Sequence, residues 1–449
     1  MSEWQMVKIG DFLKEREGRY KPDDGELNNI PRLDKIDFSG IIHLSTKPTK
    51  TDMIIVQPGD LVISGINVAK GAIAIWEGDH PIAATIHFSS YIFDKTKIDI
   101  DFFKRYLKSP VFIKALQAQV KGGIKTEIKA NHLLPLQVSI PLLPIQQKIK
   151  KNFELLEGDL SNLTDEIKNQ STILSKLRQS ILQEAIEGKL TADWRKAHSV
   201  RKGDAEYDAG ALLEKIKEEK QKLVAEGKIR KEKSPQISRI NTDKMPFAVP
   251  EGWVWCRLGE IADGFQYGTS SKSLKTGEVP VLRMGNVQSG KIDWTDLVYT
   301  SSKDEIKQYK LQEGDLLFNR TNSRELVGKT GLFDNSREAI FAGYLVRFSM
   351  LENIKAEYAN ILMNSKLHRE WCDANKTDAL GQSNINATKL RYFLFPLPPL
   401  AEQRAIVERV EEMLALVDEM EVQVKTRKVQ AQGLLQAVLR EAFEGDEND

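Results

Sequence analysis

The sequence predicts an α+β fold built twice, with two tandem mixed domains that each lead into one long helix. Three pairs of similar segments indicate the duplication: QSILQEAIEGK (179–189) and QAVLREAFEGD (436–446), IPLLPIQQKI (140–149) and LPPLAEQRAI (397–406), and VQPGDLVIS (56–64) and LQEGDLLFN (311–319). The offset is 257 residues for the first two pairs and 255 for the third. Because the offset is constant only where a helix is expected, we infer a duplicated unit whose loops diverged while its helix length stayed the same.

The composition is typical of a globular protein from a reducing compartment. The chain has 449 residues, of which 41% are hydrophobic and 29% charged, and this length predicts two or three domains. The two cysteines, Cys256 and Cys372, argue against a disulfide framework. The sequence contains no apolar run of about 18 residues that could span a membrane, and we expect a cytoplasmic location. Since the net charge is +1, any binding of nucleic acid must come from local patches.

Apolar runs and turn residues divide the chain into five parts. These are a first mixed domain (1–140), a first helix (141–190), a charged connector (191–249), a second mixed domain (250–396) and a second helix (397–449). Apolar runs predict strands at 60–64, 72–76, 279–284 and 315–319, and one helical stretch in each domain, at 102–116 and 358–371. In the connector we expect an exposed helix over 211–228 and an unpacked linker over 228–238. A solvated spacer and a phosphate-contacting segment both fit this lysine-rich stretch.

Each long helix is opened by prolines and carries a heptad seam, with apolar residues at alternating steps of four and three. The seam of the first helix contains Phe153, Leu156, Leu160, Leu163, Ile167, Leu174 and Leu177. The seam of the second contains Val410, Met413, Val417, Met420, Val424 and Leu434. A polar residue interrupts each seam at an equivalent position, Gln170 in the first and Arg427 in the second. Each helix of about 40 residues would be roughly 60 Å long, and the two seams are most simply buried against each other.

Familiar catalytic and metal-binding motifs are missing from the sequence. No G-x-G-x-x-G follows a predicted strand, and the GKT at 328–330 lacks the upstream glycine of a phosphate loop, so we interpret Gly328 as a hairpin glycine. The six histidines are dispersed, and both cysteines are expected to be buried or inert. Asp60 and Asp315 follow glycines in equivalent turns and are explained by turn formation. The sequence therefore predicts a binding protein without catalytic or metal-binding residues.

Two similar domains separated by a stiff spacer suit a ligand with two spaced sites, such as double-stranded DNA. Polar loops in both domains carry residue types that contact DNA: arginine for guanine, asparagine and glutamine for adenine, and lysine for phosphate. The candidates in the first domain are Lys47, Lys50, Asn67, Lys70, Lys121 and Lys125. Those in the second are Arg283, Asn286, Arg320, Asn322, Ser323, Arg324, Lys329, Gln382, Ser383 and Asn384. The alternative is that these are ordinary exposed loops.

Several motifs together resemble the specificity (S) subunit of type I restriction–modification systems. The strongest are PLPPLAEQRAIV (396–407), its partial match PLLPIQQKI (141–149), and the helix ends EAIEGKLTADWR (184–195) and EAFEGD (441–446). PEGWVWCRLGEI (250–261) and QEGDLLFNRTN (312–322) are also similar to this family, so the resemblance covers nearly the whole chain. One departure is that the first domain begins MSEWQMVKIG, without the PEGW lead of the second.

This resemblance implies a non-catalytic subunit with two target-recognition domains and two helices packed as an antiparallel coiled coil. Each domain would read one half of a bipartite, asymmetric double-stranded DNA site, and the helices would set the half-site spacing. Two methyltransferase (M) subunits would dock on the helices and bring S-adenosylmethionine for adenine N6 methylation. Restriction (R) subunits would add cleavage that depends on ATP and Mg, so this chain itself is expected to bind no cofactor. The alternative function is a coiled-coil adaptor between proteins, without intrinsic DNA specificity.

Overall fold

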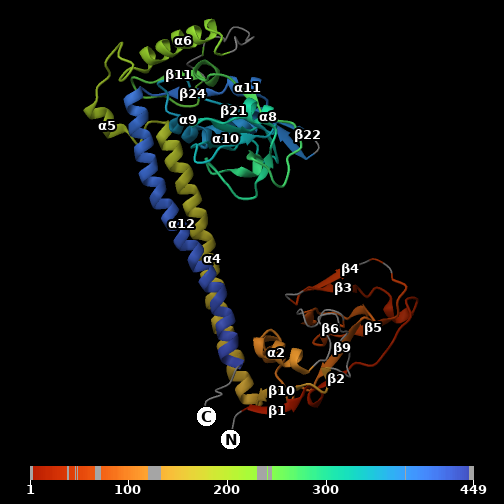
Figure 1. The fold of residues 1–449 in the computed structure, drawn as a ribbon. Helices are drawn as coiled ribbons and strands as arrows, with labels where there is room; N and C mark the ends of the chain where they lie inside the picture. The colour runs from red at the N-terminus through yellow and green to blue at the C-terminus, as the bar shows by residue number, and fades with distance from the viewer. Residues whose placement is uncertain are drawn as a thin grey trace. The chain divides into compact units, whose positions relative to one another are not determined.

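The computed structural model describes residues 4–37, 40–45, 47, 49–65, 72–119, 133–229, 240, 245–379 and 381–443. The chain divides into two compact units (Figure 1). Unit 1 contains Met1–Asn169 together with Val424–Asp449, and unit 2 contains Gln170–Gln423. Each unit combines one mixed domain with parts of both long helices, so the boundaries of the two units differ from those of the five parts predicted from the sequence.

The mixed domain of unit 1 is built on two four-stranded sheets, with strand orders β2-β9-β6-β7 and β4-β3-β8-β5. A further antiparallel pair, β1-β10, joins the beginning of the domain to its last strand and sets Trp4 opposite Pro141. The strands predicted at 60–64 and 72–76 are present as β6 and β7. The strands are β1 (Trp4–Lys8), β2 (Leu13–Glu15), β3 (Arg32–Ile36), β4 (Ile42–Ser45), β5 (Met53–Val56), β6 (Leu61–Ser64), β7 (Ile73–Ile75), β8 (Ile82–Thr85), β9 (Phe88–Phe93) and β10 (Gln137–Pro141).

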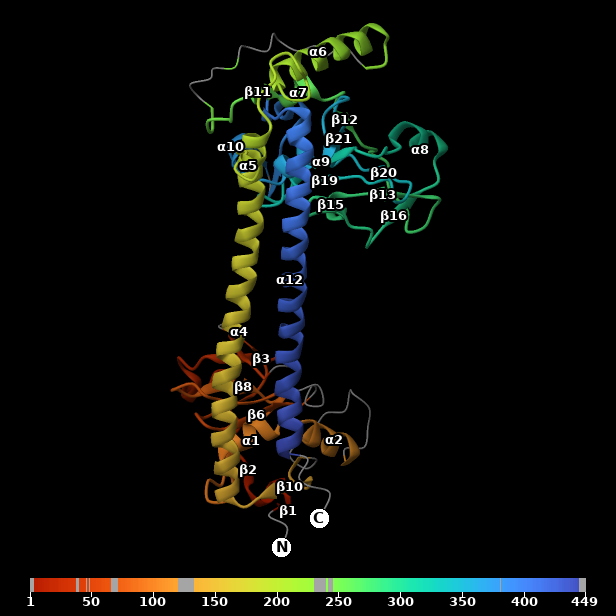
Figure 2. The ribbon, with the colours of Figure 1, turned by 90° about the vertical axis from the view of Figure 1, so that its left-hand side faces the viewer.

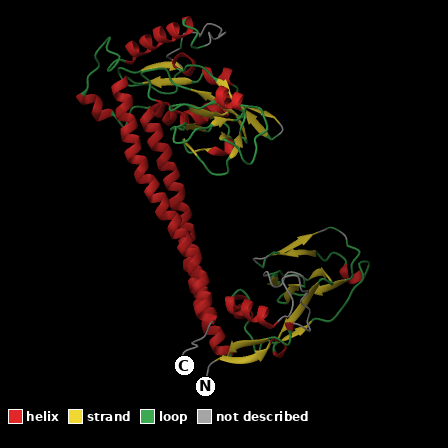
Figure 3. Cartoon of the chain, viewed as in Figure 1, coloured by secondary structure: helices red, strands yellow, loops and turns green. Residues whose placement is uncertain are grey.

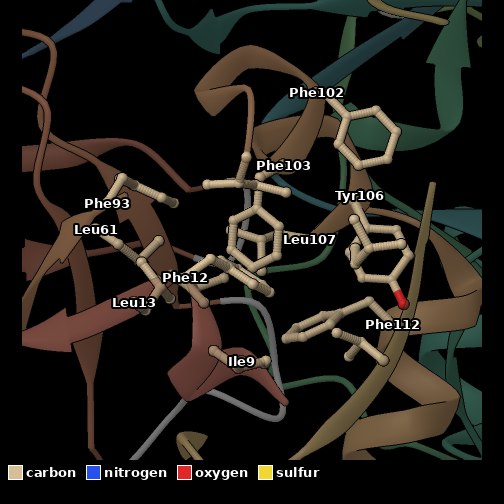
Figure 4. Packing of buried hydrophobic residues seen from close by; sticks show 14 of the residues in the cluster. Ile9, Phe12, Leu13, Leu61, Phe93, Phe102, Phe103, Tyr106, Leu107 and Phe112 are labelled. Carbon is tan, nitrogen blue, oxygen red and sulfur yellow. The ribbon is translucent and has the colours of Figure 1, made fainter. Parts of the chain in front are cut away.

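The main core of this domain lies between the β2-β9-β6-β7 sheet and two short helices, α1 (Ile100–Tyr106) and α2 (Pro110–Gln119). Its aromatic side chains meet mostly edge to face (Figure 4). The ring centroids of Phe12 and Phe103 are 5.2 Å apart, and those of Tyr106 and Phe112 are 5.8 Å apart. Such pairs add attraction to the burial of the rings themselves.

The mixed domain of unit 2 repeats this plan and enlarges it. Its sheets have the orders β12-β21-β17-β19, β16-β13-β20 and β18-β23-β22, and β11-β24 is the equivalent of β1-β10. The strands predicted at 279–284 and 315–319 are present as β13 and β17. The elements are β11 (Val254–Arg257), α7 (Leu258–Ile261), β12 (Gln266–Tyr267), β13 (Val279–Leu282), β14 (Val287–Gln288), β15 (Lys291–Ile292), β16 (Val298–Thr300), α8 (Lys303–Tyr309), β17 (Leu316–Asn319), β18 (Thr321–Asn322), β19 (Thr330–Leu332), β20 (Ile340–Phe341), β21 (Leu345–Phe348), α9 (Ala356–Met363), α10 (Lys366–Asn375), β22 (Thr377–Ala379), β23 (Gln382–Asn384), α11 (Ala387–Arg391) and β24 (Leu394–Leu397).

The helical stretch expected in each mixed domain is two helices rather than one. Ser109 lies between α1 and α2, and Ser365 lies between α9 and α10; both serines are buried. Each hydroxyl donates to a carbonyl of the preceding helix at 2.7 Å and accepts from the amide three residues ahead. The expectation of one continuous helix is wrong because a serine can satisfy the end of one helix and the first turn of the next.

Both long helices have 44 residues: α4 (Leu143–Ile186) and α12 (Leu400–Phe443). Their first residues and their last residues are each 257 positions apart, so the constant offset in the sequence corresponds to helices of equal length. Within each unit, the portions of α4 and α12 run side by side in two perpendicular views (Figures 1 and 2). The prediction of a mixed helix and sheet fold with two long helices is confirmed (Figure 3). None of the helices in the described ranges is long and apolar enough to cross a membrane.

A buried glutamine ties the first turn of each long helix to its mixed domain. In unit 1, Gln146 accepts from Asp99 N at 2.8 Å and donates to Pro141 O at 2.8 Å. In unit 2, Gln403 makes the equivalent two bonds at 2.9 and 3.0 Å. An amide side chain carries both a donor and an acceptor, which explains why glutamine occurs in both copies of the proline-rich motif.

Most residues of the heptad seam are either buried or exposed, while Leu160, Met413 and Val424 are intermediate. Five are at most 7% exposed: Phe153, Ile167, Leu174, Val410 and Val417. Five others are between 37% and 53% exposed: Leu156, Leu163, Leu177, Met420 and Leu434. The expectation that the two helices bury both seams is therefore met only in part, because packing within this chain leaves these side chains accessible.

The connector is folded along most of the part that the structure describes. Helix α5 (Ala192–Ala197) follows α4, and α6 (Ala209–Ala225) packs against β11 and α7 of the second mixed domain. The expectation of an exposed helix is wrong for one face of α6, where Leu212 and Ile216 are fully buried. Most of the linker expected at 228–238 lies outside the described residues.

The turn residues singled out in the sequence have structural roles. Asp60 accepts from Gln57 N at 2.9 Å and is paired with Arg16, and Asp315 accepts from Gln312 N at 2.8 Å. Gly328 has a φ of +93°, and a Cβ atom there would lie 2.4 Å from Cys372 Sγ. The interpretation of these residues as turn formers is confirmed.

Candidate nucleic-acid interface

Two loops that are far apart in the sequence form one small sheet in unit 2. β18, which follows Arg320, pairs antiparallel with β23, which in turn pairs with β22. Asn384 Nδ2 also donates to Thr321 Oγ1 at 2.7 Å. The candidates Arg320 and Asn322 are thus brought beside the candidates Gln382 and Asn384 on a single three-stranded sheet.

Arg320 contacts two tyrosines whose side chains are exposed, through the ring of Tyr267 and the backbone carbonyl of Tyr344. Its guanidinium carbon is 4.6 Å from the centroid of the Tyr267 ring, and its backbone N–H donates to Tyr344 O at 3.0 Å. Tyr267 is 41% exposed and Tyr344 is 52% exposed. The Tyr267 hydroxyl accepts from Ala387 N at 3.1 Å, just beyond β23. We call Tyr267, Arg320, Asn322, Tyr344, Gln382 and Asn384 the recognition surface.

A lysine joins the loop between β18 and β19 to the hairpin β14-β15. Lys329 Nζ donates to Gln288 Oε1 at 2.7 Å, which links the loop before β19 to the hairpin β14-β15. The turn of this hairpin is held by Leu332 N, which donates to Gly290 O at 3.1 Å. Arg324 is exposed, and so are Lys272 and Lys275 in the loop after β12. Cationic side chains therefore lie in the loops that follow β12 and β18, two strands that carry residues of the recognition surface. This distribution suits phosphate contacts.

The structure corrects two of the predicted contact residues. Asn286 is 3% exposed, and its side chain holds the turn before β14: it accepts from Arg283 N and donates to Asp293 O and Thr295 O, each at 2.9 Å. Ser383 is 1% exposed and donates to Asp378. Both side chains are used inside the domain, so neither is available to a ligand on this surface.

The remaining candidates differ in how available they are. Arg283 is 38% exposed at its side chain and is paired with Asp296 at 2.9 Å, whereas Ser323 is partly buried beside Asn322. In unit 1, Lys47 and Lys50 are exposed after β4. Asn67, Lys70, Lys121 and Lys125 lie outside the described residues.

The exposed tyrosines were not predicted from the sequence. An aromatic residue beside a strand is most often a core residue, and nothing in the pattern around Tyr267 or Tyr344 marks these rings as exposed. A buried pair was also missed: His368 and Cys372 face each other on α10, with Sγ 3.4 Å from Nε2. In the described ranges, no group of three or more His, Cys, Asp or Glu side chains is placed to hold a metal ion.

The buried pair on α10 is held in its neutral form. Burial lowers the pKa of His368 to about 3, helped by the nearby Arg369, and burial raises the pKa of the Cys372 thiol to about 12. A neutral thiol is a poor nucleophile. The expectation that Cys372 is buried and inert therefore agrees with its surroundings.

The buried His368 should make unit 2 less stable in acid. Below its unfolded pKa of 6.5 the unfolded chain binds a proton that the folded chain does not, so stability present above pH 6.5 is lost as the pH falls towards 3. The slope reaches at most about 1.4 kcal/mol per pH unit. We expect His368→Gln to flatten this slope, measured by denaturation at several pH values between 4.5 and 7.5. The folding of unit 1 in the same samples is the control, and a slope that is unchanged in the variant would refute this role for His368.

Together, the fold and this surface define a duplicated, two-domain binding protein with a polar and aromatic recognition surface. Residues 250–426 match the family model described as the type I restriction modification DNA specificity domain. The specificity subunit of the EcoKI type I restriction enzyme from Escherichia coli strain K12 is 26% identical over 97% of this chain and 85% of its own length. That of the Escherichia coli EcoEI enzyme is 28% identical over 60% of this chain, a match that spans less than half (45%) of the EcoEI subunit.

Solved structures of low sequence identity share the fold. The HsdS subunit from Thermoanaerobacter tengcongensis has a TM-score of 0.52 at 17% identity and covers 99% of this chain and 97% of its own. A chain from a structure describing complex assembly and conformational transition of the type I R-M system has a TM-score of 0.60 at 16% identity, covering 99% of this chain and 98% of its own. The chain is therefore similar to type I restriction–modification specificity subunits along nearly its whole length, and its second mixed domain carries the match to their DNA specificity domain.

Proposed function

We propose that this chain is the non-catalytic DNA-recognition subunit of a type I restriction–modification complex, in which each mixed domain reads one half of a bipartite, asymmetric site. The observation that carries this proposal is the duplication itself. Two domains of one plan lead into helices of 44 residues each, at a constant offset of 257 residues. A reader of two different half-sites needs two similar surfaces and a fixed spacing between them.

An antiparallel coiled coil would supply that spacing. In unit 1, Phe153 of α4 stacks on Phe443 of α12, with ring centroids 5.6 Å apart. In unit 2, Arg178 of α4 pairs with Asp418 of α12. From the first contact to the second, the residue number rises by 25 on α4 and falls by 25 on α12. This common register supports an antiparallel pairing of two helices that are each about 66 Å long at 1.5 Å per residue.

The accessible seam residues suit two copies of one partner. Leu163 and Leu434 belong to unit 1, and the equivalent residues Met420 and Leu177, 257 positions away, belong to unit 2. All four are between 37% and 53% exposed. Since apolar side chains that repeat in two equivalent places favour two equivalent interfaces, we infer that two methyltransferase subunits dock on the helices.

The chemistry of the complex would then come from its partners. The methyltransferase subunits would bind S-adenosylmethionine and methylate adenine, and restriction subunits would use ATP and Mg. This chain would supply DNA specificity and hold no cofactor of its own. The adaptor function is the second candidate, because the accessible seam residues favour protein partners whether or not DNA is read.

The experiment is to map methyladenine in genomic DNA after co-expression of this chain with a methyltransferase subunit, with methyltransferase alone as the control. We expect one bipartite motif with a methylated adenine in each half. The map is then repeated with seven residues removed from the centre of both α4 and α12. The half-sites should keep their sequences while their spacing changes or methylation is lost. A stable complex that produces no motif would favour the adaptor, and a motif with unchanged spacing would overturn the role of the helices.

A further inference from the structure

The position of Arg320 is fixed on both sides of its backbone. Its N–H donates to Tyr344 O at 3.0 Å, and its carbonyl accepts from Ile385 N at 2.9 Å. These bonds connect it to the strand β21 region on one side and to the end of β23 on the other. A residue anchored between two strands presents its side chain more reproducibly than a residue at a loop tip.

The guanidinium of Arg320 is also oriented. It lies over the ring of Tyr267, 4.6 Å from the centroid, within the range of a favourable cation–π contact. Tyr267 is itself held by the pairing of β12 with β21, where it lies opposite Val346, and by the bond between its hydroxyl and Ala387 N. The Nε atom of Arg320 is buried, so the two terminal nitrogens are the groups that a ligand can reach.

Arg320 differs from three other arginines of the second mixed domain because no acid neutralises it. Arg283 is paired with Asp296, Arg347 with Asp315, and Arg369 with Asp373. Among the described residues, no hydrogen-bond or ion-pair partner is found for the guanidinium of Arg320. A planar donor pair held in place without an acid is suited to a ligand that offers two acceptors side by side.

We propose that Arg320 reads a guanine in the half-site recognised by the second domain, with Tyr267 as the residue that positions it. This inference rests on the proposed function and adds one residue and one base to it. Guanine presents O6 and N7 in the major groove as two adjacent acceptors, the arrangement that a fixed guanidinium matches. The immediate neighbours on the recognition surface are amides and tyrosines, Asn322, Asn384 and Tyr344, whereas the cations that suit phosphate lie in the loops around it.

The test compares four variants in the complex with the methyltransferase: Arg320→Ala, Arg320→Lys, Tyr267→Leu and, as a matched control, Arg337→Ala at an exposed arginine outside the recognition surface. Methyladenine mapping and competition binding with single-base variants of the site give the readouts. We expect Arg320→Ala and Arg320→Lys each to lose roughly 10- to 100-fold discrimination at one guanine of one half-site, with the other half-site unchanged. Tyr267→Leu should weaken discrimination at the same position, and Arg337→Ala should match the wild type.

The lysine variant separates base reading from phosphate binding. If Arg320 contacts phosphate, Arg320→Lys keeps the charge and behaves like the wild type, while Arg320→Ala weakens all sequences alike; either result overturns the proposal. Relaxation in both half-sites, or at a base other than guanine, also overturns it. Complex formation and thermal unfolding of each variant identify any that fails to fold, in which case Tyr267→Leu carries the test. A wild-type complex without a bipartite motif would instead count against the proposed function itself.

Discussion

Replacement of Glu402 by glutamine is expected to destabilise unit 2 by about 3 kcal/mol, because it removes the charge at the centre of a buried network. Glu402, in the first turn of α12, is 1% exposed and accepts three hydrogen bonds. The donors are Trp253 Nε1 at 2.7 Å, Thr191 Oγ1 at 2.7 Å and Arg195 Nη1 at 2.5 Å. A glutamine at this position has no charge to balance that of Arg195. Its NH2 group would also point towards one of the three donors that the carboxylate now accepts from.

The network joins three parts of the sequence within unit 2. Thr191 and Arg195 belong to the beginning of the connector, Trp253 to the start of the second mixed domain, and Glu402 to α12. The equivalent position in the first repeat is Ile145, so unit 1 has no counterpart to this carboxylate. The cost should therefore appear in unit 2 alone.

Hydrogen–deuterium exchange of the full chain measures the two units separately. Glu402→Gln should increase exchange in β11, α5 and the first turns of α12 and leave β6 and β9 of unit 1 unchanged. Arg404→Ala is the matched control, because Arg404 pairs with Glu206 at the surface, where an ion pair is worth less than about 1 kcal/mol. Equal stability of Glu402→Gln and the wild type in denaturant would show that the network does not hold unit 2 together.

Replacement of Phe443 by alanine should destabilise unit 1 by about 3–5 kcal/mol, the usual cost of emptying a buried phenylalanine site. Phe443 is 2% exposed at the end of α12, and its ring is 5.4 Å from those of Phe102 and Tyr106 and 5.6 Å from that of Phe153. The last turn of the second long helix thus completes the core of the first mixed domain.

The lower stability of unit 1 is measured as faster hydrogen–deuterium exchange in β2, β6 and β9. Val429→Ala, on the same helix but 62% exposed, is the control and should change stability by less than about 0.5 kcal/mol. If Phe443→Ala weakened unit 2 as much as unit 1, the assignment of the end of α12 to the core of unit 1 would be wrong.

Much of the architecture was predictable because it depends on local patterns that the duplication shows twice. Heptad steps and prolines predicted the two long helices, and the constant offset predicted their equal lengths. Glycine–aspartate turns next to apolar runs predicted β6 and β17. The predicted single helices failed at Ser109 and Ser365, where a buried hydroxyl decides the break and no change in hydrophobic pattern marks it.

The candidate site was predictable only in its residue types. Asn322, Gln382 and Asn384 were expected in polar loops but lie in the short strands β18 and β23. Asn286 and Ser383 look the same in the sequence and are buried. A polar side chain in a loop can equally well face a ligand or satisfy its own turn. Which of these it does depends on neighbours that are distant in the sequence.

By itself, the sequence determined the duplication, the length of the long helices and the resemblance to type I specificity subunits, since each of these depends on repeated or contiguous residues. Only the tertiary structure decided that β18 and β23 form one sheet, that Tyr267 supports Arg320, that Phe443 completes the core of unit 1, and that the connector packs on the second domain. The physical reason is the same in each case: a long-range contact is fixed by how side chains from separate segments fill one space and satisfy one another's hydrogen bonds. No local sequence pattern in either segment specifies which distant segment it will contact.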